Sequence, residues 1–377
     1  MGIFYGNFNP DSTFTNDIGS ITRLATSAPF GRYLQEEIFQ NSAFVTSGIL
    51  RPDAALSNTV GTRIEAPFFA PLNYIEERVD SSDTWGLNQS GYYTSQKTKA
   101  STQYATITTR GAMFSADDLS RYQTGEDALA NIRSQLARDM ARKMDQKLIS
   151  QVWGLVSDAD SPLHATHSCD VSICQGDVTV ANSLNPQNVT GAKYLLSERA
   201  GTLDSIAVHP DVAAWLETAG MLTYTNVTNT ANAASSIWGS GGIGLSSTEV
   251  RLFAGLRVVV DEQLPVVCNP DSSGGDQGQA QYHCYLFQSG VVRTGQQFPL
   301  LIETERNIAS LQNALAVTYS NCMHVMGTSW ASVHDGPTNE MLRDPSNWEL
   351  AYCDPRLIPL VELVVNVDMA CLNGGCA

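Results

Sequence analysis

A single long amphipathic stretch, residues 124–156, constrains the fold of this chain more than any other segment. Its apolar residues recur at spacings of three or four, the period of one stripe of an α-helix: Leu129, Ile132, Leu136, Met140, Met144, Leu148, Val152 and Leu155. Thr124 can cap the first turn, and Asp127 can reach back to it as in a capping box. At about 1.5 Å per residue this helix would run roughly 45 Å, well beyond the usual three to four turns.

The charged side chains of the same stretch mostly fall off the apolar stripe. We expect them to face water or neighbouring chains: Arg138, Asp139, Arg142, Lys143, Asp145 and Lys147. The pattern alone would also fit an ordinary long core helix, so the segments on either side of it decide the interpretation.

The composition limits the classes of function. The 377 residues carry a formal net charge of −16, and only 16% of them are charged. Phosphate binding requires a basic surface, so this balance argues against a dedicated nucleic-acid binder. No window holds the ~18 apolar residues of a membrane span, and the N-terminus lacks the pattern of a signal peptide. We therefore expect no membrane segment and folding in a cytoplasm.

The segments around the long helix predict an extended arm, a hairpin and an α/β lobe. Residues 1–26 are polar and predict an extended arm, after which Ser27 caps a short amphipathic helix. Two β-rich stretches, 62–69 and 102–114, enclose a polar centre and predict a long projecting hairpin. An isolated hairpin is marginal in water, so this one needs a partner surface. From residue 188 onward, helix and strand patterns alternate.

Several phrases, taken in order, carry a resemblance to a known family. They are GTRIEAPFF, TITTRGAMFSADDLSRYQTGEDALANIRSQLARDMARKMDQKLI, LDSIAVHPDVAAWLETAGML, LFAGLRVVVDEQLPV, YHCYLFQSGVV, FPLLIETERN and NWELAYCDPRLIPLVELVVN. Each phrase alone is weakly specific, but their joint order resembles the major capsid proteins of tailed bacteriophages with the HK-ninety-seven-like fold. The resemblance covers most of residues 28–367.

The resemblance implies an α+β fold with a defined order of parts. We expect an N-terminal arm with a short helix, an extended hairpin called the E-loop, and a peripheral (P) domain built on the long spine helix. An α/β axial (A) domain, return strands of the P domain and a C-terminal tail follow. The corresponding residues are 1–55, 56–113, 114–190, 191–300, 301–339 and 340–377.

The resemblance also implies a structural function. We expect the chain to self-assemble, as hexamers and pentamers, into the icosahedral shell that encloses the double-stranded DNA of a tailed phage. It would act without catalysis or a cofactor, without sequence-specific DNA binding and without a membrane. Its location would be the virion, after assembly in the host cytoplasm. The 26 residues ahead of Ser27 are too few for a fused scaffolding domain, so we expect either a separate scaffolding protein or a scaffolding segment that has already been removed. The other expected partners are a portal and in some cases a cement protein.

One loop gathers residue types that bind metals. His164, His167, Cys169 and Cys174 could together hold a structural Zn²⁺, although their spacing matches no common zinc finger. A disulfide between the two cysteines, or two free thiols, are the alternatives. Cys371 and Cys376 bracket a flexible LNGG segment and could form a local disulfide once a virion leaves its reducing host.

The remaining candidates for chemistry are weaker. Four cysteines lie in or beside apolar stretches and are expected to be buried: Cys268, Cys284, Cys322 and Cys353. His283 and His324 stand near cysteines but lack an oriented third partner, which favours core histidines with satisfied hydrogen bonds. Lys97 and Lys99 lie in the hairpin, where some relatives place cross-linking lysines, but no acceptor is identifiable. The GSGGIG segment at 239–244 lacks the rest of a phosphate loop.

Two other functions compete with the capsid interpretation. An encapsulin-like nanocompartment would use the same fold to enclose cargo enzymes in a cell. A metal-dependent enzyme would be built on the cluster at 164–174. Neighbouring genes for terminase, portal and tail proteins would separate a virus from a nanocompartment, and a stoichiometric bound metal would support the enzyme.

Overall fold

The structure, a computed structural model, describes residues 41–57, 61–69, 100–117, 128–174, 176–226, 249–270, 277–307 and 312–367. Some of the predicted features lie outside these ranges. They are the N-terminal arm with its first helix, the caps Thr124 and Asp127, the hairpin centre with Lys97 and Lys99, the 239–244 segment, Cys371 and Cys376.

The predicted long helix is confirmed as α5, Ala128–Val152, which continues as a π-helix, η2, Trp153–Ser157. The apolar stripe is buried from Leu136 to Leu155. It forms one core cluster with residues from both sheets of the protein, among them Val325 and Tyr285. Helix α5 is therefore the element on which the two sheets meet.

The expectation that the charged residues of this helix face water is wrong for two of them. Arg138, Asp139, Arg142 and Lys143 are exposed, as expected. Asp145 and Lys147 are buried, with exposed fractions of 4% and 2%. The reason is that α5 is covered on more than one side, so positions off the apolar stripe also meet protein.

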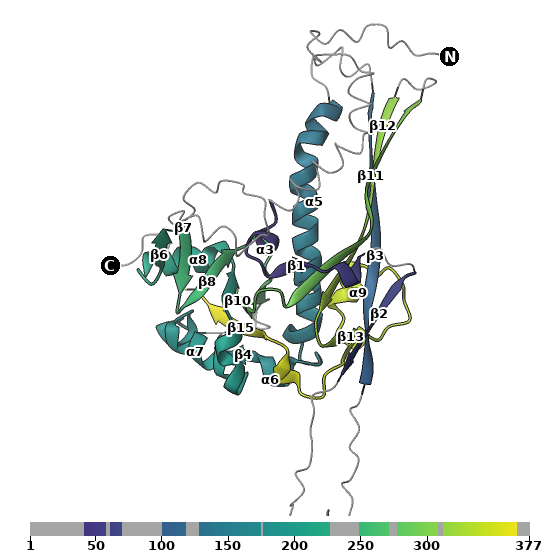
Figure 1. The fold of residues 1–377 in the computed structure, drawn as a ribbon. Helices are drawn as coiled ribbons and strands as arrows, with labels where there is room; N and C mark the ends of the chain where they lie inside the picture. The colour runs from purple at the N-terminus through teal and green to yellow at the C-terminus, as the bar shows by residue number, and fades with distance from the viewer. Residues whose placement is uncertain are drawn as a thin grey trace, which may run out of the picture.

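A five-stranded sheet lies along one side of α5, and Figure 1 shows its long strands beside the helix. In order across the sheet, the strands are β1 (Leu50–Pro52), β11 (Val292–Asn307), β12 (Gln312–Val325), β3 (Ala100–Asp117) and β2 (Arg63–Phe69). Strand β1 runs parallel to β11, and the other pairs are antiparallel. Strands β2 and β3 pair from Arg63↔Thr106 to Phe69↔Ala100, which confirms the base of the predicted hairpin.

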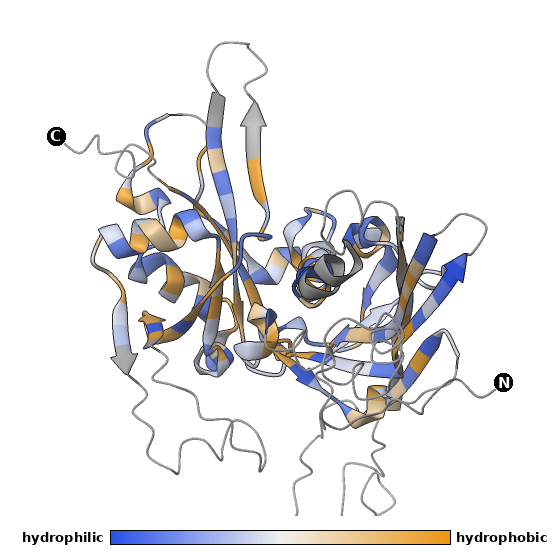
Figure 2. Ribbon diagram, turned by 90° about the horizontal axis from the view of Figure 1, so that it is seen from above, coloured by the Kyte–Doolittle hydropathy of each residue, from blue (hydrophilic) through white to orange (hydrophobic). Residues whose placement is uncertain are grey.

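An eight-stranded sheet forms the lobe on the other side of α5, as Figures 1 and 2 show. Its path is β4 (Ser168–Asp170), β15 (Leu360–Asn366), β10 (Gln277–Phe287), β5 (Ser205–Val208), β8 (Leu256–Val260), β7 (Glu249–Phe253) and β6 (Thr223–Asn226), with β9 (Val266–Pro270) also paired to β10. The C-terminal strand β15 thus lies inside this sheet, between β4 and β10. The chain crosses to the five-stranded sheet between Phe287 and Val292.

Helices α7 (Pro186–Tyr194) and α8 (Pro210–Thr218) contribute to the core of the lobe. Both begin with a proline just after a capping residue, Asn185 or His209, whose side chain accepts a backbone N–H. The short elements are α3 (Ala43–Thr46), η1 (Ala54–Leu56), α6 (His164–His167), η3 (Val180–Asn182), η4 (Ser197–Thr202), β13 (Thr328–Trp330), α9 (Asn339–Arg343), η5 (Pro345–Asn347), β14 (Trp348–Leu350) and η6 (Pro355–Leu357).

Gly154 lets the end of the spine helix approach helix α9. A Cβ at this position would lie 2.4 Å from the Leu342 carbonyl oxygen and 3.0 Å from Trp348 Nε1. We expect Gly154→Ala to lower the free energy of unfolding by about 1–3 kcal/mol, because a backbone atom would have to move. Chemical denaturation measures this loss.

The matched control is Gly191→Ala in helix α7, where a Cβ would meet nothing within 4 Å. That change should be neutral or stabilise the protein by up to about 1 kcal/mol, since alanine favours a helix over glycine. Equal effects of the two substitutions would contradict the tight packing at Gly154.

Candidate functional site: the helix junction and the open sheet face

Lys147 ties helix α5 to the middle of the five-stranded sheet. Its ammonium group donates to Thr108 Oγ1 on β3, to Asn321 Oδ1 at 2.8 Å and to the Asn321 carbonyl oxygen at 3.2 Å on β12. These three oxygens match the three N–H donors of a charged lysine. Burial lowers the pKa of Lys147 to about 7. An amino group that is charged below about pH 7 is thus held by neutral oxygens in the core, which fixes the position of the helix on the sheet.

Asp145, on the same helix, anchors the short helix α3. The Ser42 hydroxyl donates to Asp145 Oδ1 at 2.5 Å, and the Ala43 backbone N–H donates to Oδ2 at 3.3 Å. Burial raises the pKa of Asp145 to about 7, although the hydrogen bond from Ser42 opposes this. Asp261, in the loop after β8, adds a second negative group nearby, and its own pKa is also raised by burial.

The buried Asp145 predicts a pH-dependent stability. Its folded pKa lies above the ordinary 3.8, so between about pH 4 and pH 7 the folded chain binds more protons than the unfolded chain. The stability contributed by this group therefore falls as pH rises through that window. We expect the free energy of unfolding of Asp145→Asn to increase relative to that of the wild type as the pH rises from 4 to 7. Above pH 7 the difference between the two proteins should stay constant.

Urea unfolding between pH 4 and pH 8 measures this difference, and Asp139→Asn, an exposed position of the same helix, is the control. The charged neighbours Asp261, Glu262 and Arg142 remain in both variants, with Arg142 bound to Glu262 at 2.6 Å. A difference between Asp145→Asn and the wild type that stays constant over the range would contradict the prediction.

Glu362 forms the third buried polar centre, where the π-helix meets the lobe. Its carboxylate accepts from Ser157 Oγ at 2.5 Å, from Ser168 Oγ at 3.0 Å and from His283 Nδ1 at 2.7 Å. The Ser157 hydroxyl also lies 2.8 Å from Tyr285 Oη. Glu362 is fully buried in strand β15. The carboxylate stands between Ser157 and His283, so the histidine is not placed to activate the serine as a base.

The structure does not bring the four loop residues together as a metal site. His164 Nδ1 lies 2.9 Å from the Val156 carbonyl oxygen, and the two His167 nitrogens contact Thr166 Oγ1 and the Ile358 carbonyl oxygen. Cys169 and Cys174 do not share a disulfide. Within the described ranges, no group of three or more His, Cys, Asp or Glu side chains is placed to hold a metal ion.

The other cysteines and histidines divide between core and surface. Cys284 and Cys322 are buried, as expected, but Cys353 is exposed, because it lies in the loop between β14 and η6. His283 is satisfied by Glu362. His324 is a different case, because its Nε2 is buried without a hydrogen-bond partner in the described chain. Burial lowers the pKa of His324 to about 4, which keeps the ring neutral.

One face of the five-stranded sheet is open within the described chain. Leu315 and Val317 of β12 face the core that contains α5. The alternate register positions lie on the opposite face, and there Met113 and Leu301 have exposed fractions of 69% and 46%. Phe69, at the end of β2, is 78% exposed. Apolar side chains left in water on an extended sheet favour contact with another protein surface.

Sequence reasoning missed Asp145, Lys147 and Glu362. Glu362 had a visible signal, because it interrupts the apolar run LVELVV of a buried strand. Asp145 and Lys147 had none, since their partners are 103 and up to 174 positions away in the chain. No described helix is long and apolar enough to cross a membrane.

Comparison with known proteins relates this chain to phage capsids. No family model matches the sequence. The sequence is 24% identical over 342 residues to the major capsid protein of Bacillus phage SPP1, and the match covers 88% of this chain and 94% of that protein.

Solved capsid structures share the fold. The capsid of cyanophage Pam1 matches with a TM-score of 0.52 at 12% identity, over 87% of this chain and 93% of that one. The capsid of Ralstonia phage GP4 matches with a TM-score of 0.51 at 11% identity, over 85% and 87% of the two chains. The expected α+β class with the HK-ninety-seven-like fold is confirmed.

Proposed function

We propose that this chain, a structural protein of a phage capsid shell, is the major capsid protein that closes the icosahedral head of a tailed phage around its double-stranded DNA. The observation that carries the proposal is a sequence relationship to a major capsid protein that spans 88% of the chain. The open sheet face with Met113 and Leu301 supports it, because a shell subunit must bury such surface against its neighbours.

The parts of the chain take the roles expected for this fold. Residues 1–55 form the N-terminal arm, and 56–113 form the E-loop. Helix α5, in residues 114–190, and the return strands in residues 301–339, which include β12, build the P domain. The lobe serves as the A domain, mainly residues 191–300. The C-terminal segment, 340–377, adds strand β15 to the sheet of this lobe.

Assembly proceeds through heterologous contacts that close into rings of five and six subunits. A separate scaffolding protein guides the shell in the host cytoplasm, a portal occupies one vertex, and a cement protein is a further candidate partner. The net charge of −16 fits a container whose wall does not grip DNA phosphates, so the packaged genome stays free to move. The role requires neither a cofactor nor catalysis.

The hairpin provides the test of this function. In one variant, residues 70–99 are replaced by a short glycine–serine turn, which keeps the paired base of β2 and β3. We expect this subunit to fold, because the described core clusters lie outside the replaced segment, and to lose the ability to form shells. Circular dichroism and thermal unfolding check the fold, and electron microscopy counts closed particles.

Two matched variants sharpen this result. A glycine–serine linker of the same length at 70–99 keeps the length of the segment but removes its side chains. We expect this variant also to form no shells. Replacement of the short segment 271–276 by a linker, in a different connection of the chain, should leave shell formation intact. Normal shells from the hairpin-less subunit would contradict the proposed role of the E-loop.

A further inference from the structure

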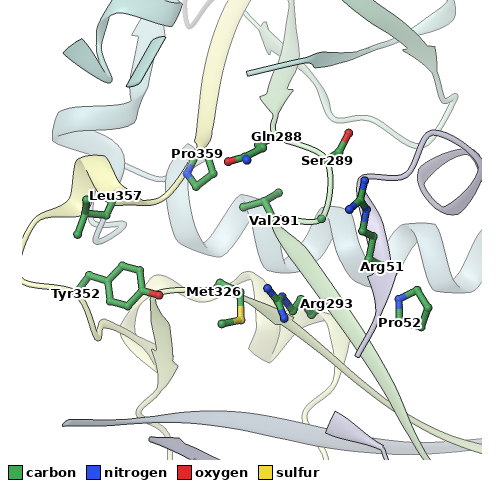
Figure 3. A pocket seen from close by; sticks show the side chains of 11 residues that line it. Arg51, Pro52, Gln288, Ser289, Val291, Arg293, Met326, Tyr352, Leu357 and Pro359 are labelled. Carbon is green, nitrogen blue, oxygen red and sulfur yellow. The ribbon is translucent and has the colours of Figure 1, made fainter. Parts of the chain in front are cut away.

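A pocket with two arginines lies where the chain crosses between the two sheets. It has a volume of about 410 Å³, within the range of pockets that hold small ligands or single side chains. Figure 3 shows Arg51 on β1 and Arg293 on β11, with Gln288 and Ser289 on the side of the lobe and Met326 and Tyr352 across from Arg51. The lining thus combines two cations, several neutral polar groups and apolar walls.

The two arginines are direct neighbours across the parallel strands β1 and β11. Arg51 pairs in register with Arg293, so their side chains leave the same face of the sheet from two strands that lie about 4.8 Å apart. The flanking pair, Leu50 and Val292, is buried on the opposite face. Like charges placed directly opposite each other on a sheet repel and destabilise it. This pair therefore favours a nearby negative charge.

The chain itself supplies a counter-charge for one arginine. Asp53 Oδ2 binds Arg293 Nη1 at 2.6 Å, and this contact lowers the pKa of Asp53. Another carboxylate, that of Asp204, accepts the backbone N–H of the pocket residue Ser289 at 3.0 Å. Within the described residues, no carboxylate forms an ion pair with Arg51. Arg51 is exposed, so its positive charge is met by solvent and can bind a carboxylate that reaches the pocket.

The position of Arg51 is fixed by the turn that lines the pocket. Gly290 adopts a φ of +78°, and a Cβ there would lie 2.9 Å from Arg51 Cδ and 3.3 Å from its Nε. The backbone N–H of Gly290 donates to the carbonyl oxygens of Gly48 and Ile49, just ahead of β1. The glycine therefore lets the arginine stem lie against the turn, which restricts where its guanidinium can go.

We propose that this pocket receives an acidic side chain, Asp or Glu, from another copy of the chain. The guanidinium of Arg51 would bind the carboxylate through two N–H donors, and Tyr352, Met326 and Leu357 would contact the aliphatic stem. A second copy is the source that the composition favours, because each chain carries 38 acidic residues against 22 basic ones. The choice of that source rests on the proposed shell function.

A single carboxylate fits the surroundings better than a nucleic-acid strand. A strand brings many phosphates, and a protein with a net charge of −16 repels a long polyanion. Asp53 beside the pocket adds to that repulsion. One acidic side chain on a mixed polar and apolar segment meets little of this unfavourable charge.

The first experiment measures the chemistry of the pocket on the full-length protein. The probe is a short fluorescein-labelled peptide with two glutamates between glycines, followed by fluorescence anisotropy at low salt. We expect Arg51→Gln to weaken binding about tenfold, the effect of losing a charge-assisted contact. The peptide affinity of Arg51→Lys should lie between those of the wild type and Arg51→Gln, because lysine keeps the charge but not the paired donors. Arg199→Gln, an exposed arginine in η4, should bind like the wild type.

Two controls keep this result decisive. The same peptide with glutamine in place of glutamate should bind none of the variants measurably. Arg51→Gln should not lower the unfolding temperature, because it removes the repulsion between Arg51 and Arg293. An unchanged unfolding temperature shows that weaker peptide binding does not result from unfolding. Equal binding by the wild type and Arg51→Gln would overturn the proposal. So would an Arg51-dependent affinity for a single-stranded oligonucleotide that exceeds the affinity for the peptide.

A second experiment tests the source of the acidic group. Static light scattering follows self-assembly of the wild type, Arg51→Gln and Arg199→Gln as the protein concentration rises. We expect Arg51→Gln alone to need a higher concentration to assemble. Unchanged assembly together with lost peptide binding would overturn a second copy as the occupant. A wild type that never assembles would instead count against the shell function, while the peptide experiment would still report on the pocket.

Discussion

Replacing Lys147 with alanine is expected to lower the free energy of unfolding by about 3–5 kcal/mol. The change empties a fully buried volume next to helix α5 and removes every hydrogen bond that joins Lys147 to Thr108 and Asn321. Urea unfolding followed by circular dichroism measures the loss. Lys143→Ala, an exposed lysine on the same helix, is the control and should stay within about 0.5 kcal/mol of the wild type.

Lys147→Met separates packing from charge. Methionine fills much of the same space, and Thr108 Oγ1 still donates to Asn321 Oδ1 at 3.0 Å, so we expect a smaller loss of about 1–2 kcal/mol. The folded pKa of Lys147 lies below its ordinary 10.5, so between about pH 7 and pH 10 the unfolded chain binds more protons. Wild-type stability should therefore rise relative to Lys147→Met across that window. A loss in Lys147→Ala no larger than in Lys143→Ala would show that the lysine does not hold the helix.

Replacing Glu362 with alanine should have an effect of similar size, about 3–5 kcal/mol. A buried hydrogen-bond donor that loses its acceptor costs about 1–3 kcal/mol, and here several donors lose the same acceptor. The substitution leaves Ser157, Ser168 and His283 without their common acceptor at the place where the π-helix meets the lobe. Glu349→Ala, on an exposed position of β14, is the matched control with an expected change under about 0.5 kcal/mol.

A double-mutant cycle with His283→Ala isolates the pair. Because the two side chains are in direct contact at 2.7 Å, we expect their effects to be non-additive by about 1–3 kcal/mol. Additive losses would mean that Glu362 acts through the two serines rather than through the histidine.

The buried polar groups explain how one helix can serve two sheets. Lys147 holds α5 on strands β3 and β12, while the Glu362 network holds the π-helix at its end on strands β10, β15 and β4. Asp145 adds the segment ahead of β1. Directional bonds of this kind fix the angle between the five-stranded sheet and the lobe, which a shell subunit needs in order to present its contacts in a set geometry.

The sequence predicted the elements that depend on local pattern. Apolar residues at helical spacing were sufficient for α5, and alternation between turn signals was sufficient for the paired strands β2 and β3. The end of a helix was harder to predict. Helix α7 ends at Tyr194, and Ser197 then takes a φ of +53°, a conformation that its residue type does not signal.

The sequence pattern did not indicate which elements that are distant in the chain would contact each other. The apolar segment at 360–366 predicts a strand, but nothing in it indicates that its parallel partner would be β4, more than 190 residues earlier. The same holds for Asp145 and Lys147, whose burial depends on α3 and on β12. The pocket at Arg51 exists only because a turn of the lobe meets strand β1, so composition alone could not have indicated it.

The measurement that tests the shell function most directly is size-exclusion chromatography with light scattering on the purified protein, followed by negative-stain imaging of the heaviest fraction. The proposed function predicts closed icosahedral shells, or rings of five and six subunits together with tubes. A protein that remains a monomer or small oligomer across salt and concentration, even when the neighbouring genes are co-expressed, would contradict it.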